Sequence, residues 1–178
     1  MKKRFIMTAF GKDRPGILAE VSQVVYENGC NLEDSTMTIL ADEFAMILLL
    51  EGREEGQLEK RLLSDCRRLE REKGISAFVH EVVGEKRTAQ KETSLYVLRV
   101  EGLDQAGIVY KISRYLADHH INVSNLNSRM DYSPDSGAAI YTMEIQIEVP
   151  AGMTENDLDS GLTQVGNALN VDISLVKQ

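Results

Sequence analysis

The chain has 178 residues, of which 43% are hydrophobic and 27% are charged, and its formal net charge is −8 at pH 7. This apolar content is enough for one or two small cores. The acidic balance argues against binding to the nucleic-acid backbone, which requires a basic surface, so we expect no direct nucleic-acid partner. The longest apolar run, Phe44 to Leu50, is far shorter than the ~20 residues of a membrane-spanning helix, so we expect no membrane association.

The N-terminal residues are basic, but no cleavage-site pattern follows them, so no signal peptide is predicted and we expect a cytoplasmic protein. Cys30 and Cys66 follow no metal-binding or redox spacing and are interpreted as core thiols. His119 and His120 could ligate a metal together with Asp118, but adjacent histidines at a helix end point in different directions. Because no catalytic or phosphate-binding motif is present, we expect no enzymatic activity, no metal site and no cofactor.

The first half of the chain alternates strand and helix patterns. An apolar stripe at helical spacing follows the first turn and consists of Ile17, Leu18, Val21, Val24 and Val25. The predicted elements are, in order, a strand (4–10), a turn (11–16), a helix that ends at 28–29, two strands (35–40 and 44–50), a loop (52–56), a second helix stopped by Gly74, and a closing strand (75–83). Their order is β-α-β-β-α-β.

The second half repeats that order. Its predicted elements are a strand (95–100), a turn (102–107), a helix, a weak strand (125–130), a loop (132–137), a clearly alternating strand (141–149), a last helix preceded by a capping box at Thr154 and Asp157, and a closing strand (171–176). Residues 85–93 contain no large apolar side chain and are interpreted as a linker between a first domain (1–84) and a second domain (94–178).

The two halves align without a gap, so that Gly11 matches Gly102, Asp13 matches Asp104, Gly16 matches Gly107 and Asn31 matches Asn122. Such self-similarity indicates one fold used twice. The order predicts an α+β protein of two tandem ferredoxin-like βαββαβ domains, each with an antiparallel sheet that has both helices on one face. The other sheet face and the edge strands are left uncovered. Because edges are commonly blocked by another copy, we expect a homodimer.

The turn from 11 to 16 can support ligand binding. The N-terminus of a helix has free backbone amides that suit a carboxylate, the Asp13 carboxylate can accept from an ammonium group, and Asn31 can both donate and accept. The two side chains lie at opposite ends of the helix, about 20 Å apart, so one pocket needs a facing turn from a neighbouring domain. Alternatively, the glycines only permit a tight turn, Asp13 only caps the helix and Asn31 only lies in a turn.

Two motifs carry a family resemblance. The segment Asp13-Arg14-Pro15-Gly16-Ile17 follows a strand, and Asn28-Gly29-Cys30-Asn31 precedes the next one. Both segments resemble the ACT domain, an amino-acid-sensing module appended to many biosynthetic enzymes. Two such units on one chain resemble the tandem family typified by the glycine cleavage system transcriptional repressor. The resemblance implies a small amino acid bound at a domain interface by residues that match Asp13, Arg14, Pro15, Gly16, Ile17 and Asn31, with Asp104, Gly107 and Asn122 as weaker counterparts.

Three hypotheses therefore remain, of which an enzyme of unrecognised type has the least support from the sequence. The first is a regulatory amino-acid-binding protein that acts through ligand-dependent association with a protein partner, in the control of amino-acid (glycine) metabolism or its transcription. The second is a structural dimerisation or interaction module with a vestigial ligand pocket.

Overall fold

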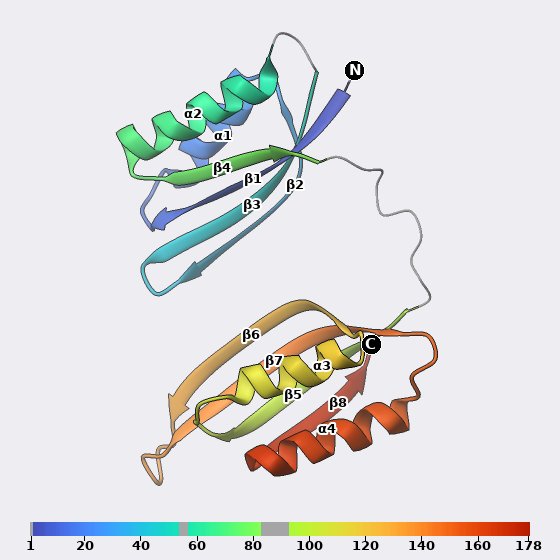
Figure 1. The fold of residues 1–178 in the computed structure, drawn as a ribbon. Coiled ribbons are helices and arrows are strands. Elements are labelled where there is room, and N and C mark those ends of the chain that lie inside the picture. Colours follow the sequence, from blue (N-terminus) through green and yellow to red (C-terminus); the bar gives the residue numbers. More distant parts are fainter. Residues whose placement is uncertain (1, 54–56, 83–92) are drawn as a thin grey trace. The chain divides into compact units, whose positions relative to one another are not determined.

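The computed structural model describes residues 2–53, 57–82 and 93–178, which form two compact units, Met1–Lys86 and Arg87–Gln178. Both units have the same order of elements (Figure 1). Each contains one four-stranded antiparallel sheet and two helices, so the predicted fold class is confirmed. The predicted linker (85–93) lies outside the described residues except for its last residue, Thr93, which begins a strand.

The first unit has the strand order β2-β3-β1-β4. Its elements are β1 (Lys2–Lys12), α1 (Ile17–Glu27), β2 (Asn31–Leu40), β3 (Glu43–Arg53), α2 (Leu58–Lys73) and β4 (Ser76–Glu81). Alternate side chains of β1 and β3, such as Met7 and Leu48, are buried against apolar side chains of both helices, such as Val21 and Leu62. The core therefore lies on one face of the sheet, the face that both helices cover in Figure 1.

The second unit has the equivalent strand order, β6-β7-β5-β8. Its elements are β5 (Thr93–Leu103), α3 (Ile108–Asp118), β6 (Asn122–Tyr132), β7 (Ala139–Pro150), α4 (Glu155–Leu169) and β8 (Val171–Lys177). The predicted cap of the last helix is confirmed, because the Asp157 amide donates to Thr154 Oγ1 at 3.2 Å. Leu98, Ile112 and Ile145 lie at the centre of its core.

The strands β2 and β6 each contain a shift in register near their start. In β2 the shift lies between Leu32 and Asp34, where the strand pairs with β3, and in β6 it lies between Val123 and Asn125. Such a bulge adds one residue to the strand and breaks its two-residue alternation. For this reason the predictions that strands begin at 35 and 125 were wrong: β2 begins at Asn31 and β6 at Asn122.

The predicted loop over 52–56 was also wrong at its start. Gly52 and Arg53 continue β3 and pair with Lys3 and Lys2 of β1, while residues 54–56 lie outside the described part of the chain. A glycine is tolerated in this strand because its missing side chain leaves room for Leu58 and Cys30, which lie 2.5 and 2.9 Å from the position of a Cβ at Gly52. The glycine therefore serves core packing.

Both cysteines pack as the sequence predicts. Cys66 is buried in the core of the first unit, and Cys30 is half-buried against the same core. Burial raises the pKa of the Cys30 thiol, and it raises the pKa of Cys66 to about 11. Both thiols are therefore protonated at neutral pH, which makes them poor nucleophiles. None of the helices in the described ranges combines the length and the apolar character needed to cross a membrane.

Candidate functional site

The turn between β1 and α1 is held by two backbone hydrogen bonds. The Asp13 amide donates to the Asp42 carbonyl at 2.8 Å, which joins the turn to the β2–β3 hairpin, and the Glu20 amide donates to the Gly16 carbonyl at 3.0 Å. Gly16 occupies the N-cap position of α1 with φ 96° and ψ −9°. Side chains disfavour this left-handed conformation, so a glycine at this position permits the abrupt entry into the helix.

The prediction that Asp13 caps α1 was wrong. The N-cap residue is Gly16, so Asp13 lies too far before Ile17 for its side chain to bond the first-turn amides. Among the described residues, the exposed Asp13 carboxylate has no hydrogen-bond or ion-pair partner, and the amides of Ile17, Leu18 and Ala19 have no backbone acceptor. One carboxylate and several backbone donors are therefore available at this turn.

Arg14 fastens the turn to the rest of the unit. Its guanidinium binds both carboxylate oxygens of Glu20, with Nη2–Oε2 at 2.6 Å and Nη1–Oε1 at 3.3 Å. Its Nη2 also donates to the carbonyl of Lys73, the last residue of α2, at 3.3 Å. The hydrogen bond lowers the pKa of Glu20 and raises that of Arg14. The Arg14 side chain is therefore held by other residues of the unit, while the neighbouring first-turn amides have no backbone acceptor within the described ranges.

Asn31 lies at the other end of the sheet from Asp13. It opens β2 opposite Glu51, whereas the Asp13 turn follows Lys12, which pairs with Glu43 at the far end of β3. Asn31 is exposed and is a strand residue, so the alternative that it merely lies in a turn was wrong. Within the first unit, the structure does not bring Asp13 and Asn31 together.

The second unit repeats the backbone of the turn. The Asp104 amide donates to the Ala139 carbonyl at 2.9 Å, the Lys111 amide donates to the Gly107 carbonyl at 2.9 Å, and Gly107 has φ 98°. Gln105 Nε2 donates to the carbonyl of Leu169, the last residue of α4, so that Gln105 replaces Arg14 as the fastening side chain.

The charges of this second turn differ from those of the first. Gln105 replaces Arg14, and Lys111 occupies the position that corresponds to Glu20. Asn122 opens β6 opposite Glu148, in the same way that Asn31 opens β2 opposite Glu51. The counterparts Asp104, Gly107 and Asn122 therefore share the geometry of the first set, while their surroundings carry different charges.

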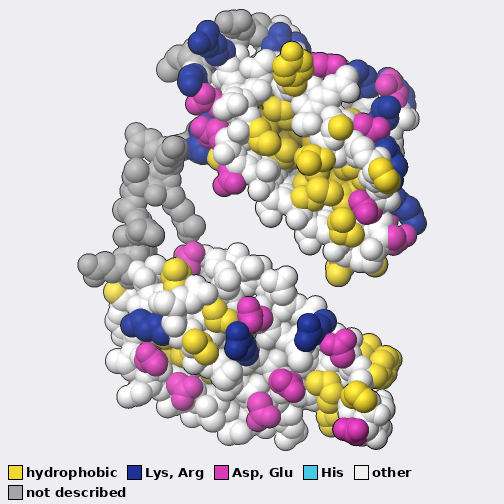
Figure 2. All heavy atoms as spheres, turned by 180° about the vertical axis from the view of Figure 1, so that it is seen from behind, with side chains coloured by type: hydrophobic (Ala, Val, Ile, Leu, Met, Phe, Trp, Pro, Cys, Tyr) yellow, Lys and Arg dark blue, Asp and Glu magenta, His cyan; other side chains and the backbone are white. Residues whose placement is uncertain are grey.

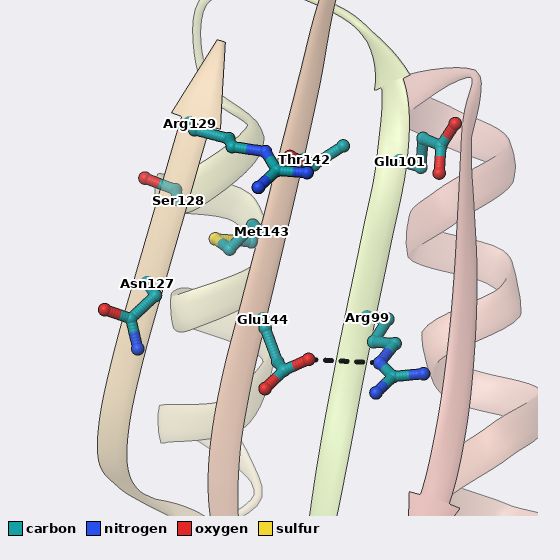
Figure 3. A pocket seen from close by; sticks show the side chains of 8 residues that line it. All are labelled: Arg99, Glu101, Asn127, Ser128, Arg129, Thr142, Met143 and Glu144. Atoms are coloured by element: carbon teal, nitrogen blue, oxygen red, sulfur yellow. Dashed lines mark hydrogen bonds and ion pairs between the residues drawn. The ribbon is translucent and has the colours of Figure 1, made fainter. Parts of the chain in front are cut away.

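A depression of about 390 Å³ lies on the second sheet, on the face that the helices leave open (Figure 3). Its lining residues are Arg99, Glu101, Asn127, Ser128, Arg129, Thr142, Met143 and Glu144. The Glu144 side chain is directed toward Arg99, with Nε and Oε2 3.1 Å apart. None of the predicted site residues lines this depression. The sequence indicates this depression only through the alternating polar residues of β7. Which residues of β5 and β6 lie beside them depends on strand register, which the sequence does not reveal.

Comparisons with known proteins match a family model to the first unit and known relatives to most of the chain. A family model of the ACT domain matches residues 3–80. The glycine cleavage system transcriptional repressor of Escherichia coli K12 is 26% identical over 175 residues, which cover 96% of this chain and 87% of the relative. A UPF0237 protein of Methanopyrus kandleri is 37% identical over 81 residues, 45% of this chain and 90% of the relative. The crystal structure of an unknown protein from Galdieria sulphuraria aligns with 26% identity and a TM-score of 0.81, over 100% of this chain and 99% of that chain.

Proposed function

Because the chain belongs to the ACT-domain family and is related over most of its length to the glycine cleavage system transcriptional repressor, we propose that it is a regulatory protein that binds a free amino acid. Neither the matching family nor these relatives names an enzyme. The regulated process is amino-acid metabolism, with glycine metabolism or its transcription as the first candidate. The observation that carries the proposal is the turn at 13–17, where neither the Asp13 carboxylate nor the backbone amides that open α1 have a hydrogen-bond partner among the described residues.

The ligand's two charged groups match that turn. Its carboxylate accepts hydrogen bonds from backbone amides of the segment from Arg14 to Ile17, those of Gly16 and Ile17 first, since Pro15 has no N–H to donate. The N-terminus of the helix favours negative charge there. Its ammonium group lies against the Asp13 carboxylate. Asn31 completes the contact from the start of β2 in another ACT unit, because within one unit it lies at the opposite end of the sheet from Asp13. The second set consists of Asp104, Gly107 and Asn122 and has the same backbone geometry. Its charges match an amino acid less well, because Gln105 and Lys111 replace Arg14 and Glu20.

A ligand held between two units links them, and this link is the means of regulation. The amino acid shifts the equilibrium toward the associated form if it binds that form more tightly than the separate units. The size of the shift equals the difference between the two binding free energies. A protein partner that recognises one form then responds to the amino-acid concentration. The second hypothesis, an interaction module whose pocket no longer binds a ligand, predicts association that no amino acid changes.

The experiment is a thermal-shift screen of the full chain against the twenty amino acids, followed by calorimetric titration of the best compound. A ligand at a hundredfold excess over its dissociation constant stabilises the fold by about 2.7 kcal/mol. For a chain of this size that is roughly 5–10 °C in melting temperature. Asp13→Ala should remove most of the shift, because the ammonium group loses its counter-charge. It should change the apo stability by less than about 0.5 kcal/mol, because Asp13 caps nothing.

The matched control is Asp104→Ala, which makes the same change at the equivalent turn of the second unit. We expect this variant to retain the stronger binding event. Equal binding by wild type and Asp13→Ala would show that the assigned site is wrong. The absence of any shift from all twenty amino acids would favour the interaction module.

A further inference from the structure

The charges of α2 alternate in sign along the sequence but separate on the helix. Successive residues of an α-helix lie about 100° apart around its axis, so residues three, four and seven apart share one side. The side of α2 opposite its buried residues consists of exposed residues, here called the basic ridge: Lys60, Ser64, Arg67, Arg68 and Arg71. All but Ser64 are bases. The acidic residues of the helix lie on the two flanks of the ridge: Glu59 and Glu70 on one, Asp65 and Glu72 on the other.

The equivalent helix of the second unit has no such ridge. The buried residues Leu58 and Leu62 of α2 correspond to Leu158 and Leu162 of α4. In this alignment, positions 60, 64, 67 and 68 correspond to exposed residues without charge: Ser160, Gln164, Asn167 and Ala168. The ridge also differs from the side of the first unit that Figure 2 shows, where hydrophobic side chains occupy the centre. The repeated fold therefore does not require bases at these positions.

Much of the charge on the ridge is available to a partner. Among the described residues, Lys60 and Arg67 have no ion-pair partner. Arg71 pairs with its exposed neighbour Glu72, with Nη2 and Oε1 2.8 Å apart. At 1.5 Å per residue, the ridge extends for about 16 Å from Lys60 to Arg71. It therefore presents a narrow row of cations along one helix.

Two side chains connect α2 to the segments that carry the proposed ligand site. Arg14, in the turn before α1, donates to the carbonyl of Lys73 at the end of α2. Asn28, which follows α1, is buried, and its Nδ2 donates to Oδ2 of Asp65 at 2.7 Å. Asp65 is also paired with Arg68 of the ridge, with Oδ1 and Nη2 3.1 Å apart. Contiguous bonds of this kind can carry a displacement at the ligand site to α2.

The second unit lacks the polar connection in the middle of this helix. His119 occupies the position of Asn28, and Val165 occupies the position of Asp65. Because valine has no polar side-chain atom, no hydrogen bond of this kind can join α3 to α4. The connection and the basic ridge thus occur together, in the first unit.

We propose that the basic ridge of α2 docks an acidic segment of the regulated protein partner. This inference deepens the proposed function and rests on it for the role of the partner. Carboxylates along one side of a helix or an extended segment complement a single row of cations, and such complementarity speeds encounter and fixes register. Duplex DNA fits less well, because it spreads its phosphates over a wide surface, whereas carboxylates flank this ridge and the chain has a net charge of −8.

The test is fluorescence anisotropy of a labelled helical peptide with glutamates along one side, titrated with the full chain without any amino acid. A comparison peptide has the same composition but glutamates distributed around the helix. The wild type should bind the first peptide more tightly, and added salt should weaken binding because exposed charges are screened. An exposed ion pair contributes a factor of up to about five to affinity. Arg67→Glu also adds repulsion, so it should raise the dissociation constant at least about fivefold, whereas Arg67→Lys should bind as the wild type does.

The matched control is Arg114→Glu, which makes the same change of charge at an exposed position of α3. It should leave the dissociation constant unchanged, and circular dichroism would verify that each variant is folded. Asp13→Ala should bind the peptide as the wild type does, because no amino acid is present. Docking can therefore fail while the ligand site stands, and the reverse.

Three results would overturn the proposal. One is a wild-type chain that binds neither peptide, which includes the case in which its own second unit occupies the ridge. Another is an equal loss of affinity in Arg67→Glu and Arg114→Glu, because binding would then follow net charge alone. The third is tighter binding of a short DNA duplex than of the peptide, which would make the ridge a nucleic-acid surface.

Discussion

Substitution of Gly11 by alanine tests how rigidly the turn between β1 and α1, the proposed ligand site, is built. Gly11 is the second-last residue of β1, and a Cβ added there would lie 3.0 Å from the carbonyl oxygen of Gly74 and 3.5 Å from Cε1 of Phe44. The oxygen belongs to the backbone junction between α2 and β4 and cannot move aside as a flexible side chain would. Gly11 also has φ +156°, which L side chains rarely adopt.

Both effects destabilise the variant. Backbone strain of this kind costs about 1–3 kcal/mol, and the close contact with the carbonyl adds to it. We expect Gly11→Ala to lower the free energy of unfolding of the first unit by about 2–3 kcal/mol. The matched control is Gly16→Ala, where φ is +96° but no atom lies within 4 Å of the added Cβ. The control therefore carries only the conformational cost of a left-handed residue, about 1–2 kcal/mol.

Hydrogen exchange measured by mass spectrometry reports the opening free energy of each unit separately. Peptides from β1 and β3 should lose more protection in Gly11→Ala than in Gly16→Ala, while peptides from β5 and β7 should be unchanged. Equal losses in the two variants would refute the steric part of the reasoning. No loss in either would mean that the turn adapts freely, and a rigid ligand site would then have no structural basis.

Two further predictions concern titration. The pKa of Cys66 is raised by burial from 9.0 to about 11, so its contribution to stability is complete below pH 9 and is lost as pH rises toward 11. We expect the free energy of unfolding, measured with urea, to fall by on the order of 2 kcal/mol across that pH window. In Cys66→Ala the free energy of unfolding should depend less on pH. The same pH dependence in the wild type and the variant would contradict the assignment. The pKa of Glu20 is lowered by its hydrogen bond to Arg14, so the stabilising pair is present above the ordinary value of 4.5 and is lost as pH falls through the lowered value. A carboxyl titration followed by NMR should show a low midpoint for Glu20 that rises in Arg14→Gln, and an unchanged midpoint would mean that Arg14 is not its partner in solution.

The parts of the fold that the sequence predicts are those set by local periodicity. The alternation from Tyr141 to Val149 lies within β7, and the stripe from Ile17 to Val25 lies within α1, because side-chain burial repeats regularly along both. The start of β2 was missed because the bulge after Leu32 interrupts that repeat. A bulge depends on how two strands pair, which one strand alone does not reveal.

The candidate site was predicted in its residues but not in its contacts. The repeat identified the turn at Asp13, yet capping depends on the conformation of Gly16, which decides where α1 begins. The bond from Arg14 to the end of α2 joins residues far apart in the chain, and no sequence pattern marks it. The difference between Ile47 and Glu144 is present in the sequence. Only the strand register shows that the two residues occupy equivalent positions, each at the centre of the open face of its own sheet.

The bulges in β2 and β6 also bear on how the protein avoids aggregation. Both strands lie at sheet edges, and all of their residues are exposed, so each could serve as a template for a strand from any other chain. A bulge increases the local twist and misaligns the free amides and carbonyls near it. An incoming strand can therefore extend a regular ladder only along the part of β2 that follows Asp34. Open-ended stacking of sheets, as in a fibril, requires flat and uninterrupted edges, and neither β2 nor β6 provides one.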